Sequence, residues 1–181
     1  MEEKQGKLTR SAKESAFLAT FVAMLIAIQL AFSMLAGIEI VTALFVAYAL
    51  VMGVVRGTIV AVCFSLLRCL LFGFFPTVLI LYLTYYTFVA ILFGLLGKLR
   101  IDNLFLKTLI MTVTACICTA GFTLLDDVVT PWYYAYTLEA QKAYFIASIP
   151  VMISQVICVG ISVAVLFPPL YKTFLFLHKK L

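Results

Sequence analysis

Charged side chains are scarce in this chain of 181 residues. They make up 12% of it, against about a quarter in an average soluble domain, whereas hydrophobic residues make up 65%. This imbalance excludes an ordinary soluble enzyme, a disordered tail and a nucleic-acid-binding module. The formal net charge of +5 is therefore better interpreted as a signal of membrane topology than as an affinity for nucleic acid.

Side chains that catalyse reactions or bind metals are also few. The only histidine, His178, lies near the C-terminus, and none of the five cysteines forms a C-x-x-C pair. The sequence contains no phosphate-binding loop and no G-x-S-x-G motif. No carboxylate lies deep in a hydrophobic run, so a proton relay has no evident carrier. We therefore predict a binding protein or a scaffold, not an enzyme, with no metal site and no cofactor of its own.

Long hydrophobic runs dominate the chain. A helix needs about 20 apolar residues to cross about 30 Å of hydrocarbon. Six runs approach this length, at residues 16–35, 38–55, 57–75, 77–97, 107–125 and 145–167. Spans two and three should meet at a turn around Arg56, and Pro168 and Pro169 should end the sixth span. These runs predict one all-α integral membrane domain over residues 1–181, with six transmembrane helices embedded in a lipid bilayer.

Basic residues predict how these helices are oriented. With six spans, all but two of the 13 lysines and arginines fall on one side of the membrane, the exceptions being Arg68 and Lys142. Because basic loops stay in the cytoplasm, both termini are expected to be cytoplasmic.

A stripe of small residues follows the first span. Ala19, Ala23 and Ala27 recur at four-residue spacing, which keeps them close to one face of a helix. Small side chains let another helix approach closely within a membrane. The stripe thus predicts a docking face for a partner membrane subunit; packing within the chain's own bundle, or chance in an alanine-rich helix, is the alternative.

Several polar and aromatic residues fall in the predicted outer half. Arg68 should face the interior or a wet cavity, paired with Glu39, or else snorkel to the interface. Tyr82, Tyr85 and Tyr86 share a helix face, which suits a flat, partly polar ligand as well as it suits an interfacial aromatic belt.

Three further residues are candidates for the same ligand site. Trp132, in the polar segment 126–144, is predicted more readily as an interface anchor than as a lid over a pocket. Asp127 could contact a ligand, although a solvated helix end explains it more simply. Gln155 fits ligand binding and a hydrogen bond between helices equally well.

Several weak motifs, taken in order, resemble one known family. A basic start at residues 7–10 leads into the alanine-spaced first helix, the segment Gly37-Ile38-Glu39-Ile40-Val41-Thr42 opens span two, and Leu71-Phe72-Gly73-Phe74 closes span three. Together with the length and the span count, they resemble the S components of energy-coupling factor (ECF) transporters. These are substrate-binding membrane subunits of bacterial vitamin importers.

The resemblance implies partners, a location and a ligand. The partners would be an ECF transmembrane coupling subunit, which Ala19, Ala23 and Ala27 would contact, and two ABC ATPases that use ATP. The location would be the bacterial plasma membrane. The ligand would be a vitamin or related micronutrient held in the outer half, in the region that contains the candidates named above. A cobalamin-like corrinoid ranks first, ahead of ligands like pyridoxine, a queuosine precursor or thiamine.

A scaffold function is the alternative. Membrane proteins of the MreD type, in the cell-wall elongation machinery, have a similar length and number of spans. Such a scaffold needs no ligand pocket, so Arg68 and Tyr82 should then tolerate apolar replacement.

Overall fold

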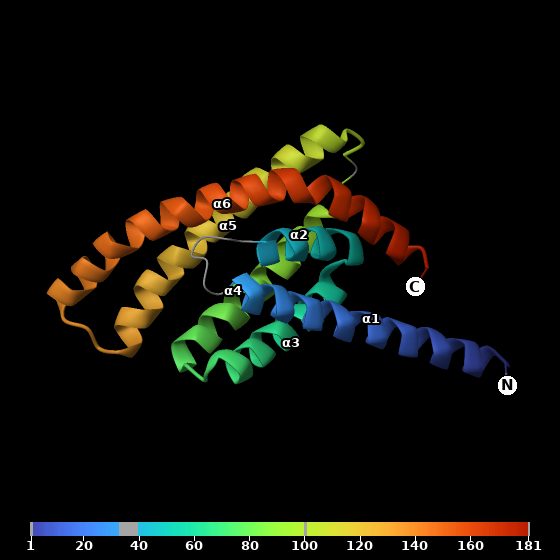
Figure 1. The fold of residues 1–181 in the computed structure, drawn as a ribbon, viewed down its shortest axis with the longest axis horizontal. Helices are drawn as coiled ribbons and strands as arrows, with labels where there is room; N and C mark the ends of the chain where they lie inside the picture. The colour runs from blue at the N-terminus through green and yellow to red at the C-terminus, as the bar shows by residue number, and fades with distance from the viewer. Residues whose placement is uncertain (1, 33–39, 100, 181) are drawn as a thin grey trace.

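The computed structural model describes residues 2–32, 40–99 and 101–180, with the backbone alone for residues 2–11. This part of the chain is all-helical, which confirms the predicted fold class at that level. Its six helices are α1 (Glu2–Phe32), α2 (Ile40–Met52), α3 (Val54–Phe72), α4 (Pro76–Leu96), α5 (Leu104–Tyr133) and α6 (Leu138–His178), as Figure 1 shows.

Five of these helices are suited to a bilayer. Among the described residues, α3, α4, α5, α6 and the 12–32 part of α1 are long and apolar enough to cross it. Large apolar side chains are exposed along all five, which fits lipid contact and is unusual for a soluble monomer. The helices thus fit a membrane-embedded protein, while the sixth span and the cytoplasmic termini stay predictions.

The helix α2 lies at the centre of the bundle. It has only 13 residues, and 11 of them are buried against α1, α3, α4 and α6. A helix this short rises about 20 Å, which is less than the hydrocarbon thickness. The described helix ends at Met52, within the predicted span 38–55, and Glu39 lies outside the described residues.

The turn between α2 and α3 is at Gly53 and not around Arg56. Gly53 has φ of +84°, a left-handed conformation that glycine adopts without steric strain. Arg56 is instead in the first turn of α3. The helix α4 crosses this junction closely, because a Cβ on Gly94 would come within 2.6 Å of the backbone nitrogen of Val54.

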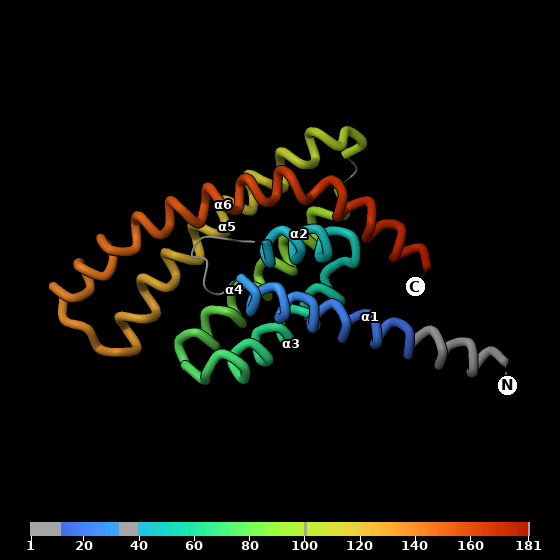
Figure 2. The backbone as a smooth tube through the Cα atoms, in the orientation of Figure 1, coloured from blue at the N-terminus to red at the C-terminus, as the bar shows by residue number. Residues whose placement is uncertain are grey.

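The helices α5 and α6 form a long hairpin that extends beyond the other helices (Figures 1 and 2). The helices extend beyond the predicted spans 107–125 and 145–167, because α5 continues to Tyr133 and α6 begins at Leu138. Pro168 and Pro169 do not end α6, which runs through them to His178. Pro168 and Pro169 have no N–H to donate to the carbonyls of Ala164 and Val165, a loss that membrane helices tolerate.

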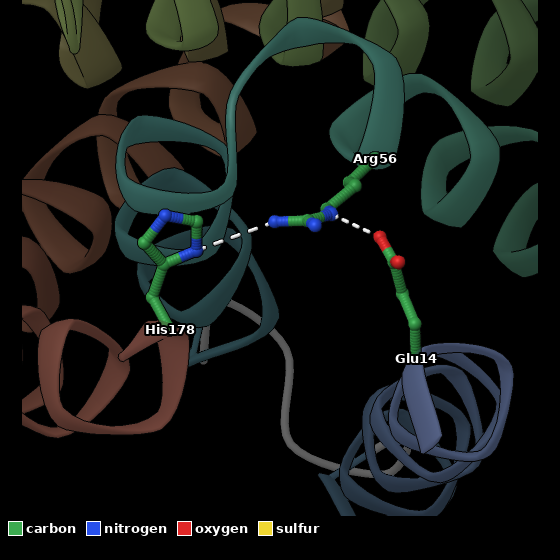
Figure 3. Close-up of polar contacts among 3 residues, drawn as sticks. All are labelled: Glu14, Arg56 and His178. Carbon is green, nitrogen blue, oxygen red and sulfur yellow. Dashed lines mark hydrogen bonds and ion pairs between the residues drawn. The ribbon is translucent and has the colours of Figure 1, made fainter. Parts of the chain in front are cut away.

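Charged groups join three helices near the two termini. Arg56 of α3 donates through Nε to Glu14 of α1 and through Nη1 to Nδ1 of His178 of α6, at 3.2 Å in the second case (Figure 3). We call this part of the molecule the terminal end. The opposite part, which holds the α3–α4 and α5–α6 turns on the left of Figure 1, is the hairpin end.

Candidate functional site

A cavity lies between α5 and α6 in the half of the hairpin nearest its turn. Its volume is about 250 Å³. Polar side chains from both helices line it. They are Thr123 and Asp126 of α5 and Tyr144, Ser148 and Gln155 of α6. The apolar part of the lining is Phe122, Ala147 and Val151. Most of the lining surface is apolar, and the polar side chains are grouped within it.

Hydrogen bonds between the two helices organise the polar wall. The hydroxyl of Tyr144 donates to Asp126 at 2.9 Å, and that of Ser148 donates to Asp127 at 2.7 Å. One turn deeper, Thr123 donates to Gln155 at 3.3 Å. These bonds stabilise polar groups that would be costly to leave unmatched in a membrane. They also explain why α5 continues as a helix past Asp126, where the sequence predicted a polar loop.

One carboxylate oxygen next to this wall has no hydrogen-bond partner in the described part of the chain. Asp127 Oδ1 is buried and makes no hydrogen bond, although Oδ2 of the same residue accepts one from Ser148. A buried acceptor without a donor costs free energy, on the order of 1–3 kcal/mol. It is the kind of group that a ligand with an N–H or O–H donor satisfies.

Aromatic side chains connect the cavity to α4. The ring of Phe122, which lines the cavity, lies 4.7 Å from that of Tyr85 and 5.9 Å from that of Tyr82. Tyr86 points to the other side, where it packs edge-on against Phe45 and Phe64 in the core. Tyr82 and Tyr85 therefore support the cavity wall, whereas Tyr86 belongs to the bundle core.

Arg68 of α3 packs against the ring of Tyr82. Its guanidinium carbon is 4.0 Å from the centroid of the Tyr82 ring and 5.5 Å from that of Phe72. Its Nε is buried and has no hydrogen-bond partner. Gln29 of α1 donates to the hydroxyl of Tyr82 at 3.2 Å, and its own Oε1 is buried without a partner. Arg68, Gln29 and Tyr82 thus form a second polar cluster, which joins α1, α3 and α4.

The structure separates the residues predicted for the ligand site. Gln155 lines the cavity, and Asp127 adjoins it through Ser148. Arg68 packs against Tyr82 in the second polar cluster and does not line the cavity. Trp132 lies apart in the last turn of α5, with 77% of its surface exposed. The interface anchor that the sequence favoured over a lid stays a prediction for this residue. The predicted contribution of Glu39 falls outside the described residues.

Several residues of the site were not among the predicted ones. They are Gln29, Thr123 and Tyr144. A pattern in α5 pointed to Thr123, since Thr119, Thr123, Asp126 and Thr130 follow one another at spacings of four, three and four. That spacing places polar groups on one helix face. No such pattern marks Gln29, whose partner Tyr82 is 53 residues away.

The alanine stripe of α1 faces away from the bundle. Ala19, Ala23 and Ala27 are all exposed, whereas the neighbouring face of the helix is buried. The buried face consists of Phe21, Val22, Leu25 and Ile26. No helix in the described part of the chain therefore covers the alanine stripe, contrary to the alternative of packing within the chain's own bundle.

Comparison with known proteins gives no relative from which a function could be transferred. The chain matches no family profile, no curated protein and no solved structure.

Proposed function

We propose that the chain is the substrate-binding membrane subunit of an ECF-type importer in a bacterial plasma membrane. It captures a vitamin or related micronutrient from outside the cell. It then docks through α1 to a transmembrane coupling subunit that carries two ATPases, and these supply the energy. The chain itself performs no reaction in this scheme.

The observation that carries the proposal is the polar cavity between α5 and α6. Asp126 of α5 and Ser148 and Gln155 of α6 converge there, and the adjacent Asp127 keeps one acceptor unmatched. Polar groups inside membrane helices are costly and mark binding sites and transport pathways more often than structural sites. A purely structural scaffold has no need of a cavity lined in this way.

The exposed alanine stripe supports the second half of the proposal. It lies on α1, which has no direct backbone contact with α5 or α6, so the cavity and the stripe are on separate helices. A flat strip of small side chains allows close approach of a partner helix. Ligand capture and docking are thereby assigned to different parts of the chain.

The volume of the cavity favours a compact ligand. Sites for drug-sized molecules enclose about 300–1,000 Å³, and this cavity of about 250 Å³ lies just below that range. The space is half open to its surroundings, so a corrinoid, which the sequence ranked first, would enter it with one part and extend outside it. Vitamins built on one or two small rings fit within the volume.

A binding experiment tests the proposal. The purified chain in uncharged detergent is titrated by calorimetry with thiamine, pyridoxine, nicotinate, pantothenate, biotin and cobalamin. We expect tight binding of one of them, and weaker binding when Asp126 is replaced by leucine. If none binds, and cell-shape proteins co-purify with the chain in place of ATPases, the MreD-like scaffold is the better description.

Docking is tested separately by filling the stripe. Ala23→Leu and Ala27→Leu should abolish uptake into cells and leave ligand binding by the isolated chain unchanged, because these side chains face away from the bundle. Ala164→Leu, at an exposed alanine of α6, is the matched control and should transport normally. Loss of binding in the α1 variants would contradict a docking function.

A further inference from the structure

We propose that the chain binds a phospholipid with an anionic headgroup at the end of the α5–α6 hairpin opposite its turn. One acyl chain of the lipid lies in an apolar groove between the two helices, and its phosphate lies beside Lys107 and Lys172. This groove shares no lining residue with the polar cavity, and α1 with its alanine stripe has no direct backbone contact with α5 or α6. The inference therefore goes beyond the proposed function and does not depend on it.

The groove lies between the first turns of α5 and the part of α6 around Pro168 (Figure 1). Its volume is about 390 Å³, and it is half open to its surroundings. Phe105 and Leu109 of α5 are in its wall, with exposed fractions of 77% and 50%. The groove thus opens away from the bundle, on the side where lipid surrounds a membrane-embedded helix.

Hydrogen bonding in the wall of the groove favours a hydrocarbon occupant. The polar side chains of the wall are those of Thr108 and Thr112. Each hydroxyl donates to the backbone carbonyl four residues earlier in α5, at 2.8 Å in both cases. Because these groups are already satisfied, an acyl chain can fill the groove without leaving a hydrogen bond unmade. A polar segment would lose its own hydrogen bonds there.

Two lysines lie next to the groove, one on each helix. Lys172 follows Pro168 by about one turn on the same face of α6, and Lys107 precedes the wall residue Thr108 in α5. Nζ of Lys107 donates to the hydroxyl of Tyr171 at 2.9 Å. Among the described residues, neither lysine has a carboxylate within 4 Å. A phosphate can therefore be the counter-ion of both.

The wider surroundings carry the same sign of charge. The segments 98–107 and 168–181, which include the start of α5 and the end of α6, contain six basic residues and one acidic residue, Asp102. Basic pockets between membrane helices bind anionic lipid headgroups. A zwitterionic lipid fills the same groove but gains less from the lysines. The charge around the groove therefore selects the class of lipid, and the apolar wall holds its chain.

Fluorescence quenching by brominated lipid tests the inference. Trp132 is the only tryptophan of the chain, so Trp132→Phe combined with Phe105→Trp leaves one tryptophan, at the groove. This protein is reconstituted in phosphatidylcholine vesicles that contain increasing fractions of brominated phosphatidylglycerol or brominated phosphatidylcholine. We expect phosphatidylglycerol to associate with position 105 roughly 5- to 25-fold more strongly than phosphatidylcholine, the range for one or two lysines near a lipid surface.

Substitutions of the lysines test the headgroup contact. Lys172→Gln should lower the preference for phosphatidylglycerol roughly 5-fold, and adding Lys107→Gln should abolish it. Lys142→Gln, at an exposed position near the turn of the hairpin, is the matched control and should leave the preference unchanged. Phe88→Trp with Trp132→Phe, at an exposed phenylalanine of α4, is the control for position and should show no preference between the lipids.

Filling the groove tests the contact with the acyl chain. Thr112→Phe places a ring in the groove and should weaken the association of both lipids with position 105. Val113→Phe, at the exposed neighbouring position outside the groove, should not. The melting temperature of each variant in detergent shows that it is folded. Glycerol phosphate, which carries the charge of the headgroup without the chain, should not compete with phosphatidylglycerol.

Four outcomes overturn the inference. They are equal association of the two lipids at position 105, the same preference at position 88, a preference that survives the loss of both lysines, and competition by glycerol phosphate. The last would assign the lysines to a soluble phosphate. A dimer that protects position 105 from both lipids would also overturn the inference, and would assign the groove to a second copy of the chain. None of these measurements uses a vitamin, so their failure leaves the proposed function in place.

Discussion

Two arginines at opposite ends of the molecule differ in what surrounds them. At the terminal end, Arg56 donates to Glu14 and to His178, and so connects α1, α3 and α6 (Figure 3). At the hairpin end, Arg68 lies among aromatic rings with Nε unmatched, and the acceptors of Gln29 and Asp127 are unmatched as well. Arg56 thus has hydrogen-bond partners within the described chain for two of its nitrogens, whereas the buried Nε of Arg68 has none.

This difference teaches how to separate a structural charge from a functional one. A polar group that is retained for stability finds its partners in the fold, as Arg56 does. A group that is kept for binding can remain unmatched until the ligand arrives, at some cost to the stability of the free protein. The two ends should therefore respond in opposite ways when their polar groups are removed.

The largest expected effect separates the two arginines by thermal stability. Arg56→Met should lower the free energy of unfolding by about 1–3 kcal/mol, because Glu14 then loses its charged partner. Arg68→Met should leave the stability of the free protein unchanged or raise it, because no hydrogen bond of its Nε is lost. Thermal unfolding in detergent measures both, and a loss of stability in Arg68→Met equal to that in Arg56→Met would contradict the comparison.

A second prediction concerns the carboxylate at the hairpin end. Asp127→Asn should weaken ligand binding roughly 10-fold, since a neutral amide is a poorer acceptor than a carboxylate. The melting temperature should stay the same or rise, because a buried charge is removed. Asp102→Asn, at an exposed position outside the helices, is the matched control for calorimetry and should change neither quantity.

The smallest effect concerns the backbone at the terminal end. Gly53→Ala should cost roughly 1–2 kcal/mol of stability, because alanine is strained at φ of +84° even though no atom obstructs its Cβ. Gly121→Ala, in a helix and equally unobstructed, should instead be neutral or stabilising. Denaturation of the two variants distinguishes strain from packing, and ligand binding should be unchanged in Gly53→Ala.

The sequence predicted the existence of the helices better than their ends. Hydropathy located the apolar runs from which the helices form. It could not show that α2 is buried by the other helices, because a helix in the centre of a bundle and a helix that faces lipid are both apolar on all sides. It also placed a polar loop after residue 125. The helix continues there because Tyr144 and Ser148 satisfy Asp126 and Asp127 from α6, and such contacts exist only after folding.

The candidate site was predictable to a similar degree. The spacing of Tyr82, Tyr85 and Tyr86 correctly indicated neighbouring side chains, yet not that Tyr86 turns into the core. The inward position predicted for Arg68 agrees with its packing against Tyr82. Its relation to Gln29 could not be foreseen, because the two meet through Tyr82 from three separate helices.

Native mass spectrometry of the chain purified from bacterial membranes tests the central claim most directly. We expect the protein to retain one small molecule with the mass of a vitamin-sized compound, and to lose it when Asp126 is replaced by leucine. A protein that carries no small molecule, and whose spectrum is the same with and without that substitution, would contradict the assignment of a binding subunit.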